Sequence, residues 1–183
     1  IQKVKNIIDK REIGEIYFIK ITYVNGAVLT NNNNVGSLFD IGTHSINLTQ
    51  WLIKDKVVDQ ILVDIQSKEF CKDDNGFIIL SRKGLLVSIH FSFLRWENQF
   101  NLEVSGSKGF INLNSLPKWG KQVLTLGKRV YPSGMPKLTR FEFNTENSWR
   151  RECEYFVNCI KGNVSDYDVE EGYQTMKLTE EIH

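Results

Sequence analysis

The feature that most constrains the fold is a run of strand signals between residues 57 and 113. Within it, residues 85–94 alternate between apolar positions (Leu85, Val87, Ile89, Phe91, Phe93) and mixed positions (Leu86, Ser88, His90, Ser92, Leu94). A period of two predicts a strand with one wetter face. The short SRKG connection at residues 81–84 has the size of a hairpin turn, so neighbouring strands should be antiparallel.

Helical patterns lie on both sides of this run. We expect strands over 15–24, 57–66, 76–84, 85–96 and 99–113, with two short strands in 122–131 and 138–144, and helices over 2–10, 36–53, 148–162 and 168–182. The polar segment 25–34 predicts a loop. Helices that bracket a run of antiparallel strands predict an α+β fold, an open, mostly antiparallel sheet with helices packed on one face. We treat 1–183 as a single domain.

Charge and cysteine content exclude several classes of protein. Lys plus Arg (23) nearly balance Asp plus Glu (22), which gives no reason to expect a nucleic acid or a membrane as partner. No apolar run approaches the ~20 residues needed to cross a bilayer. Three cysteines, without CxxC spacing, favour reduced thiols and a cytoplasmic location. The chain has no initial Met and begins directly in a helical pattern, so we expect it to be part of something longer.

The segment GSLFDIGTHSINLTQWL (36–52) carries the candidate chemistry. If it forms a regular helix, one face carries a stripe of residues three and four apart: Gly36, Asp40, His44, Asn47 and Trp51. The apolar residues Leu38, Ile41, Leu48 and Leu52 lie largely elsewhere and can pack on the sheet. Gly42 lets another group approach the helix closely. Such a stripe could contact a small polar ligand.

Asp40 and His44 form a pair one helical turn apart. An imidazole with a pKa near ~6.5 can accept a proton at neutral pH, and a carboxylate nearby can orient it and stabilise its charged form. The same pair could instead be a structural tether that fastens the helix, which is the commoner role of such pairs when these two residues are judged alone. A metal site would need at least a third ligand, and the sequence places none nearby; His90 is most simply a partly exposed strand residue. We therefore expect no metal.

The same segment resembles the Gly-x-Leu-x-Asp-x-Gly-x-His-x-Ile-Asp…Trp-Leu signature of the glucose–fructose oxidoreductase/inositol dehydrogenase (Gfo/Idh/MocA) family. Three other stretches follow in that family's order: VKNIIDKREIGEIYFIKITY resembles the start of its second domain, LEVSGSKGFINLN its GT-x-G strand pair, and ECEYFVNCIKGN…EEGYQTMKLTEEI its closing helices. The resemblance covers nearly the whole chain.

The resemblance implies the C-terminal substrate-binding and oligomerisation domain of an NAD(P)-dependent oxidoreductase acting on a sugar, cyclitol or related polyol. His44 would take the hydroxyl proton as hydride leaves the adjacent carbon for the nicotinamide of NAD or NADP. Asp40 would bind substrate hydroxyls and tune the imidazole, and Gly36 and Asn47 would also contact the substrate. A homodimer or homotetramer through the open sheet face is implied as well. One face of the 85–94 strand is fully apolar and the other is semi-apolar, and a semi-apolar face without helices invites a symmetric partner.

The sequence departs from the family pattern in three ways. Asn47 stands where the family has an acid after His-x-Ile, segment 25–34 lacks the Arg or Trp often found after the first strand, and neither a GxGxxG turn nor a Glu-Lys-Pro element is present. We therefore expect this chain alone to bind no cofactor and to transfer no hydride. The alternative is a non-enzymatic oligomerisation or interaction domain with the same fold. A metal-dependent sugar isomerase or hydrolase has too few ligands to be favoured.

Overall fold

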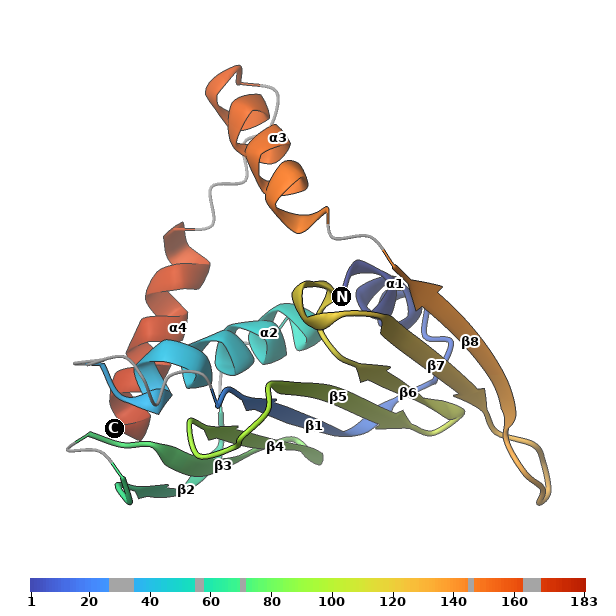
Figure 1. Ribbon diagram of the computed structural model, residues 1–183. Helices are drawn as coiled ribbons and strands as arrows, with labels where there is room; N and C mark the ends of the chain where they lie inside the picture. The colour runs from blue at the N-terminus through green and yellow to red at the C-terminus, as the bar shows by residue number, and fades with distance from the viewer. Residues whose placement is uncertain (27–34, 55–57, 70–71, 145–146, 163–168) are drawn as a thin grey trace.

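An eight-stranded sheet forms one layer of the molecule, and helices lie over one of its faces (Figure 1). The computed structural model describes residues 1–26, 35–54, 58–69, 72–144, 147–162 and 169–183. The strands are β1 (Ile16–Val24), β2 (Gln60–Gln66), β3 (Asn75–Arg82), β4 (Leu85–Ser92), β5 (Gln99–Gly106), β6 (Gly109–Asn114), β7 (Gln122–Lys128) and β8 (Lys137–Phe143). The helices are α1 (Gln2–Asp9), the π-helix η2 (Leu38–Gly42), α2 (Thr43–Ile53), the 3₁₀ turn η3 (Pro117–Trp119), α3 (Ser148–Ile160) and α4 (Val169–Ile182).

The sheet order is β2-β3-β4-β1-β5-β6-β7-β8. β1 lies in the middle, parallel to β4 and antiparallel to β5, and the other neighbouring pairs are antiparallel. This arrangement confirms the predicted α+β class and the open, mostly antiparallel sheet. The SRKG turn is confirmed as a β3–β4 hairpin, in which Lys83 and Gly84 both have positive φ, as a type I′ hairpin turn requires.

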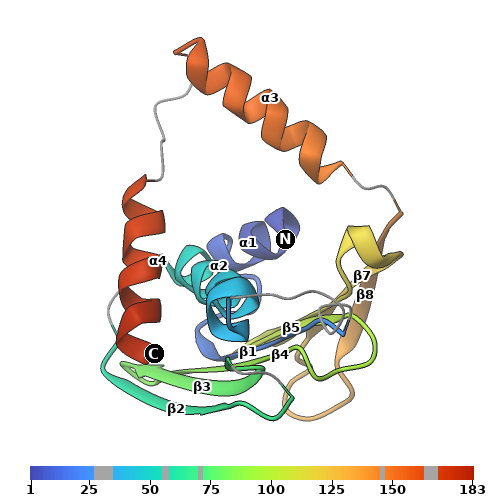
Figure 2. The ribbon, with the colours of Figure 1, turned by 60° about the vertical axis from the view of Figure 1, so that its left-hand side comes forward.

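Period-two burial places the core on the helical side of the sheet. In β4, Val87, Ile89 and Phe91 are buried. The facing positions are also buried in β3 and β1, which flank β4, and in β5 beyond β1 (Ile78 and Leu80, Ile19 and Ile21, Leu102 and Val104, respectively). Leu38, Ile41, Ile46 and Leu52 of η2 and α2 join this core, as the sequence predicted for three of them. No helix of the described ranges covers the opposite face, which we call the open face (Figures 1 and 2).

The helices differ in how closely they are packed. α2 lies across the sheet and α4 packs on α2, whereas α3 stands clear of the sheet in both views (Figures 1 and 2). Cys159 is the only buried residue of α3, and Trp149, Phe156 and Ile160 are exposed. The predicted helix is therefore present, but the described part of the chain provides no surface that covers its apolar side. None of the helices in the described ranges has the length and apolar composition that crossing a bilayer requires.

Several predicted boundaries need correction. The 57–66 strand begins at Gln60, the helix over 2–10 ends at Asp9, and the 99–113 segment is two strands joined by a tight turn at Ser107 and Lys108. Most of the predicted 25–34 loop lies outside the described residues, as does Cys71. Cys153 and Cys159 are free thiols.

Candidate functional site

The segment that carries Asp40 and His44 is helical, but it does not begin as a regular α-helix. Leu38–Gly42 form a π turn, in which the Thr43 amide donates to the carbonyl of Leu38, five residues earlier. The Thr43 hydroxyl also donates to the Phe39 carbonyl at 2.9 Å. A π turn is wider than an α turn, so residues four apart across it no longer stack as they do on an α-helix. The regular five-residue stripe predicted from spacing is therefore wrong in its first turn.

The start of this segment is held by a carboxylate from a distant part of the chain. One carboxylate oxygen of Asp73 accepts from the Leu38 amide at 2.7 Å and from the Ser37 hydroxyl at 2.8 Å, while the Asp73 carbonyl accepts from the Ser37 amide at 2.8 Å. The carboxylate satisfies helix-end donors and complements the positive end of the helix dipole. Gly36 is buried against it: a Cβ there would lie 1.7 Å from an Asp73 oxygen. Gly36 thus lets Asp73 approach.

Phe91 of β4 packs against the same turn from the side of the sheet. Its ring is fully buried and lies 3.5 Å from where a Cβ on Gly42 would be, and it fills the space that a side chain on Gly76 would need. The groups that approach Gly42 are therefore core side chains, those of Leu38 at 3.1 Å and Phe91 at 3.5 Å. Together, Asp73 and Phe91 fix the position of the turn from which Asp40 and His44 project.

Asp40 and His44 lie at the surface of this fixed turn. Asp40 is half-buried and His44 is exposed. The imidazole ring faces Tyr23 at the end of β1, with ring centroids 6.1 Å apart and planes tilted by 33°. Tyr23 in turn contacts Phe100 and Trp119, each at 5.7 Å and edge-on. The exposed base therefore lies beside an aromatic wall on the helical side of the sheet.

The other two members of the predicted stripe have structural partners. The Asn47 side-chain amide donates to the Thr175 hydroxyl of α4 at 3.1 Å, and that hydroxyl donates to Gln50 at 2.8 Å. Trp51 is half-buried, and the ammonium of Lys5 in α1 lies 5.8 Å from the centroid of its ring. Asn47 is exposed and stays a predicted substrate contact, but its partner on α4 gives it a packing role as well.

His90 lies on the open face, on the other side of the sheet from His44. Its ring stacks on Phe77 with centroids 4.1 Å apart, and its Nε2 is 3.2 Å from the Asn75 side-chain oxygen. Burial lowers the pKa of His90, and the positive charges of Arg95 and Lys20 lower it further. Within the described ranges, no three His, Cys, Asp or Glu side chains come together as metal ligands.

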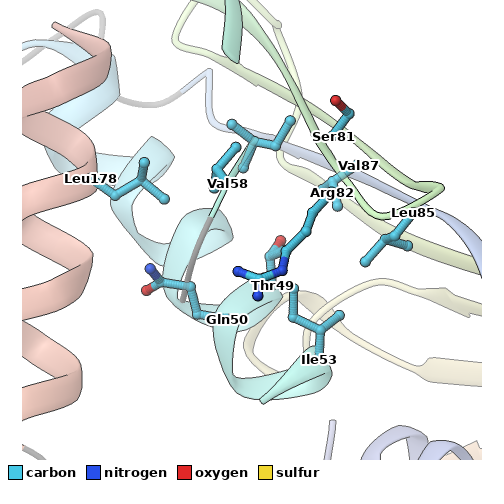
Figure 3. A pocket seen from close by; sticks show the side chains of 10 residues that line it. Thr49, Gln50, Ile53, Val58, Ser81, Arg82, Leu85, Val87 and Leu178 are labelled. Atoms are coloured by element: carbon cyan, nitrogen blue, oxygen red, sulfur yellow. The ribbon is translucent and has the colours of Figure 1, made fainter. Parts of the chain in front are cut away.

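A small pocket lies elsewhere, between α2, α4 and the β3–β4 hairpin. Its lining includes Thr49, Gln50, Arg82 and Leu178, and the Arg82 side chain extends from β3 toward the second half of α2 (Figure 3). Asp40 and His44 do not line it. Sequence reasoning missed the residues that complete the site, namely Asp73, Tyr23, Lys118 and Trp119. Tyr23 alone left a signal, since it has the same strand parity as Ile19 and Ile21.

Comparisons with known proteins agree with this fold. The family model of the GFO/IDH/MocA C-terminal domain matches residues 1–112. The ketoreductase KijD10 from Actinomadura kijaniata, a 3-ketoreductase solved with NADP, superposes with a TM-score of 0.78 at 15% identity, over 99% of this chain and 55% of its own. A putative NADPH-dependent oxidoreductase from Desulfitobacterium hafniense superposes with a TM-score of 0.81 at 17% identity, over 97% and 56%.

A third solved structure is an oxidoreductase from Agrobacterium radiobacter in complex with NAD+, L-tartaric acid and magnesium. It superposes with a TM-score of 0.63 at 18% identity, over 81% of this chain and 44% of its own. No curated protein gives a significant match. The chain spans about half the length of these structural relatives. Because the family model matches more than half of the 183 residues, and the sheet and helices agree with it, the chain belongs to the GFO/IDH/MocA family as its C-terminal domain.

Proposed function

We propose that residues 1–183 form the substrate-binding domain of an NAD(P)-dependent oxidoreductase that acts on a sugar, cyclitol or related polyol. The observation that carries this proposal is the fixed turn at residues 36–44. Asp73 and Phe91 hold it from two sides, and it presents Asp40 and the exposed His44 beside an aromatic wall. If Asp40 and His44 only fastened the helix to the rest of the domain, His44 would not need to be exposed on a turn that Asp73 and Phe91 fix.

In this proposal His44 accepts the proton of the substrate hydroxyl, or returns it in the opposite direction. An imidazole is suited to this because its ordinary pKa lies near neutral pH. Asp40 accepts hydrogen bonds from substrate hydroxyls and stabilises the protonated imidazole. Tyr23 limits the movement of the His44 ring on one side.

A nicotinamide cofactor would supply the redox half of the reaction, since hydride transfer belongs to the cofactor. The relatives were solved with NADP or NAD+ and are roughly twice as long as this chain, which supports a second, cofactor-binding part in the full-length protein. The residues here suit the substrate half, because an acid and a base project from the helical side of the sheet and no phosphate-binding GxGxxG turn is present in the sequence.

The alternative is an interaction domain without catalysis. Its support is the contact between Asn47 and Thr175, which shows that part of the motif serves packing, and the exposed apolar side chains of the open face. Both functions are compatible with self-association through the open face, which we also propose, as a homodimer or homotetramer.

The test is His44→Ala in the full-length protein, with turnover and melting temperature measured on the same sample. Loss of a general base should lower kcat by about 10²–10⁴-fold and leave cofactor binding nearly unchanged. Asp40→Asn should slow turnover and weaken substrate binding. The double variant should lose less than the product of the two single effects.

The matched control is His90→Gln, which changes a histidine on the opposite face of the sheet. The interaction-domain alternative forecasts a melting temperature a few degrees lower for His44→Ala with turnover nearly intact. If turnover of His44→Ala stays within about threefold of wild type, far short of a general-base effect, the catalytic assignment is wrong.

A further inference from the structure

A cluster of one cation and two aromatic rings lies beside His44. Lys118 and Trp119 belong to η3, between β6 and β7, and Tyr23 ends β1 on the helical side of the sheet. The Lys118 ammonium donates to the Tyr23 phenol oxygen at 3.4 Å and lies 4.9 Å from the centroid of the Trp119 ring. Since Tyr23 contacts both Lys118 and His44, the cluster and the proposed catalytic pair share one surface.

The positions of these three residues are set by the fold. Tyr23 and Trp119 are half-buried, and Tyr23 packs edge-on against Phe100, which belongs to the core. Pro117 restricts the backbone at the start of η3. Lys118 is exposed, yet its ammonium is placed over two rings that are themselves anchored. The cluster is therefore a preformed wall with a positive charge on it.

The Lys118 ammonium also has no acidic partner in the described part of the chain. Its hydrogen bond and its ring contacts are with Tyr23 and Trp119, neither of which is anionic. By comparison, Lys121, three residues later, is paired with Glu142 at 2.6 Å. An ammonium without a carboxylate partner, beside an acid/base pair, suits a ligand that brings its own negative charge.

We propose that Tyr23, Lys118 and Trp119 select an anionic sugar or polyol, one that bears a carboxylate or a phosphate, at the site of Asp40 and His44. Lys118 binds the anionic group. The Tyr23 and Trp119 rings contact the apolar C–H side of the sugar ring, and the reacting hydroxyl points to His44. This inference names the substrate class within the proposed function and rests on that function for the role of His44.

The test measures equilibrium binding to the 183-residue chain, which requires no turnover. D-glucuronate, D-glucose 6-phosphate, D-glucose and inorganic phosphate are titrated separately by calorimetry, and the Trp119 indole N–H is followed by NMR. Both acids should bind at least about tenfold more tightly than D-glucose, and Lys118→Met should remove that advantage, since a hydrogen bond to a charged group contributes this much. The ratio of the two acids identifies the anionic group.

Matched variants separate the cluster from general surface charge. Lys121→Met should keep the preference for the acids, and Lys118→Arg should retain most of it. Trp119→Leu should weaken the charged and neutral sugars alike, because both would lose the contact with the ring.

Four results would overturn the proposal. Two concern the ligands: D-glucose binding as tightly as the acids, or inorganic phosphate binding as tightly as D-glucose 6-phosphate. The other two are an equal loss of affinity for the acids in Lys118→Met and Lys121→Met, and a Trp119 signal that no sugar shifts. Failure of the proposed function is separate. If His44→Ala leaves full-length turnover intact while the acids still bind through Lys118, the catalytic role is lost and the binding site stands.

Discussion

At the scale of single residues, His90 gives stability a dependence on pH. Burial, assisted by Arg95 and Lys20, lowers its pKa, so the unfolded chain binds the proton more readily than the folded chain. The contribution of neutral His90 is complete above its ordinary pKa of ~6.5 and is lost as pH falls from there through the lowered value. The free energy of unfolding of His90→Gln should therefore fall less than that of the wild type as pH is lowered from neutral to acid. Urea unfolding across this range measures the difference. An NMR titration that places the pKa of His90 at or above its ordinary value would contradict this expectation.

Asp73 is the second residue whose contribution can be measured alone. Asp73→Ala removes the acceptor for the Leu38 amide and the Ser37 hydroxyl, and losing a helix cap typically costs about 1–2 kcal/mol. In a chain of this size the melting temperature should fall by about 2–8 °C. Asp64→Ala is the control, because the Asp64 carboxylate is exposed on β2 and accepts only from Gln66 in the hydrogen bonds observed. Equal melting temperatures for the two variants would show that Asp73 does not hold the turn.

At the scale of elements, the α2–α4 contact includes a hydrogen-bonded hydroxyl, that of Thr175. Thr175 accepts from Asn47 and donates to Gln50, and Gln50 is buried. Thr175→Val keeps the shape but leaves the Gln50 oxygen without this partner, which should cost about 1–3 kcal/mol. Thr179→Val is the matched control one turn later, since its hydroxyl, among the described residues, donates to the Thr175 carbonyl of its own helix. Chemical denaturation should rank Thr175→Val as clearly the less stable of the two.

The elements themselves were largely predictable, because each is recorded in local periodicity. The alternation from Leu85 to Phe93 gave β4, and the SRKG turn gave the hairpin with β3. The π turn at Leu38–Gly42 was not predictable, since it depends on a cap from Asp73 and a ring from Phe91 that come from other parts of the chain. The parallel pairing of β1 with β4 is a contact of the same long-range kind.

Of the candidate site, the sequence could predict only the residues that lie on its helix. Asp40 and His44 could be named because they share a short segment with the family signature. Lys118 and Trp119 follow five strands later in a segment without a motif, and only the sheet order brings them to Tyr23. Gly36 was expected to contact substrate, and its close approach to Asp73 gives it a structural reason that spacing alone could not reveal.

At the scale of the whole molecule, the open face is the surface that the helices leave uncovered. Around His90 it carries a group of partly exposed apolar side chains: Phe18, Leu62, Phe77, Ile79 and Leu86. A charge placed among them should oppose the proposed self-association. Leu86→Glu should shift the chain toward monomer at tens of micromolar, measured by light scattering. Thr139→Glu, an exposed strand position of the opposite parity, should not. A monomeric wild type at this concentration would remove the proposal.

The central position of β1 also determines when the sheet can form during synthesis. β1 is made well before both of its neighbours, since Phe18 pairs with Leu86 and Ile19 with Val104. A nascent chain that ends before β4 holds a strand of Ile16, Phe18, Ile19 and Ile21 with both edges open, and open apolar edges are sites of aggregation. Closing such distant pairs is also slow compared with hairpin formation. β1 is therefore the strand of this sheet that has most need of a ribosome-bound chaperone, until β4 and β5 have been made.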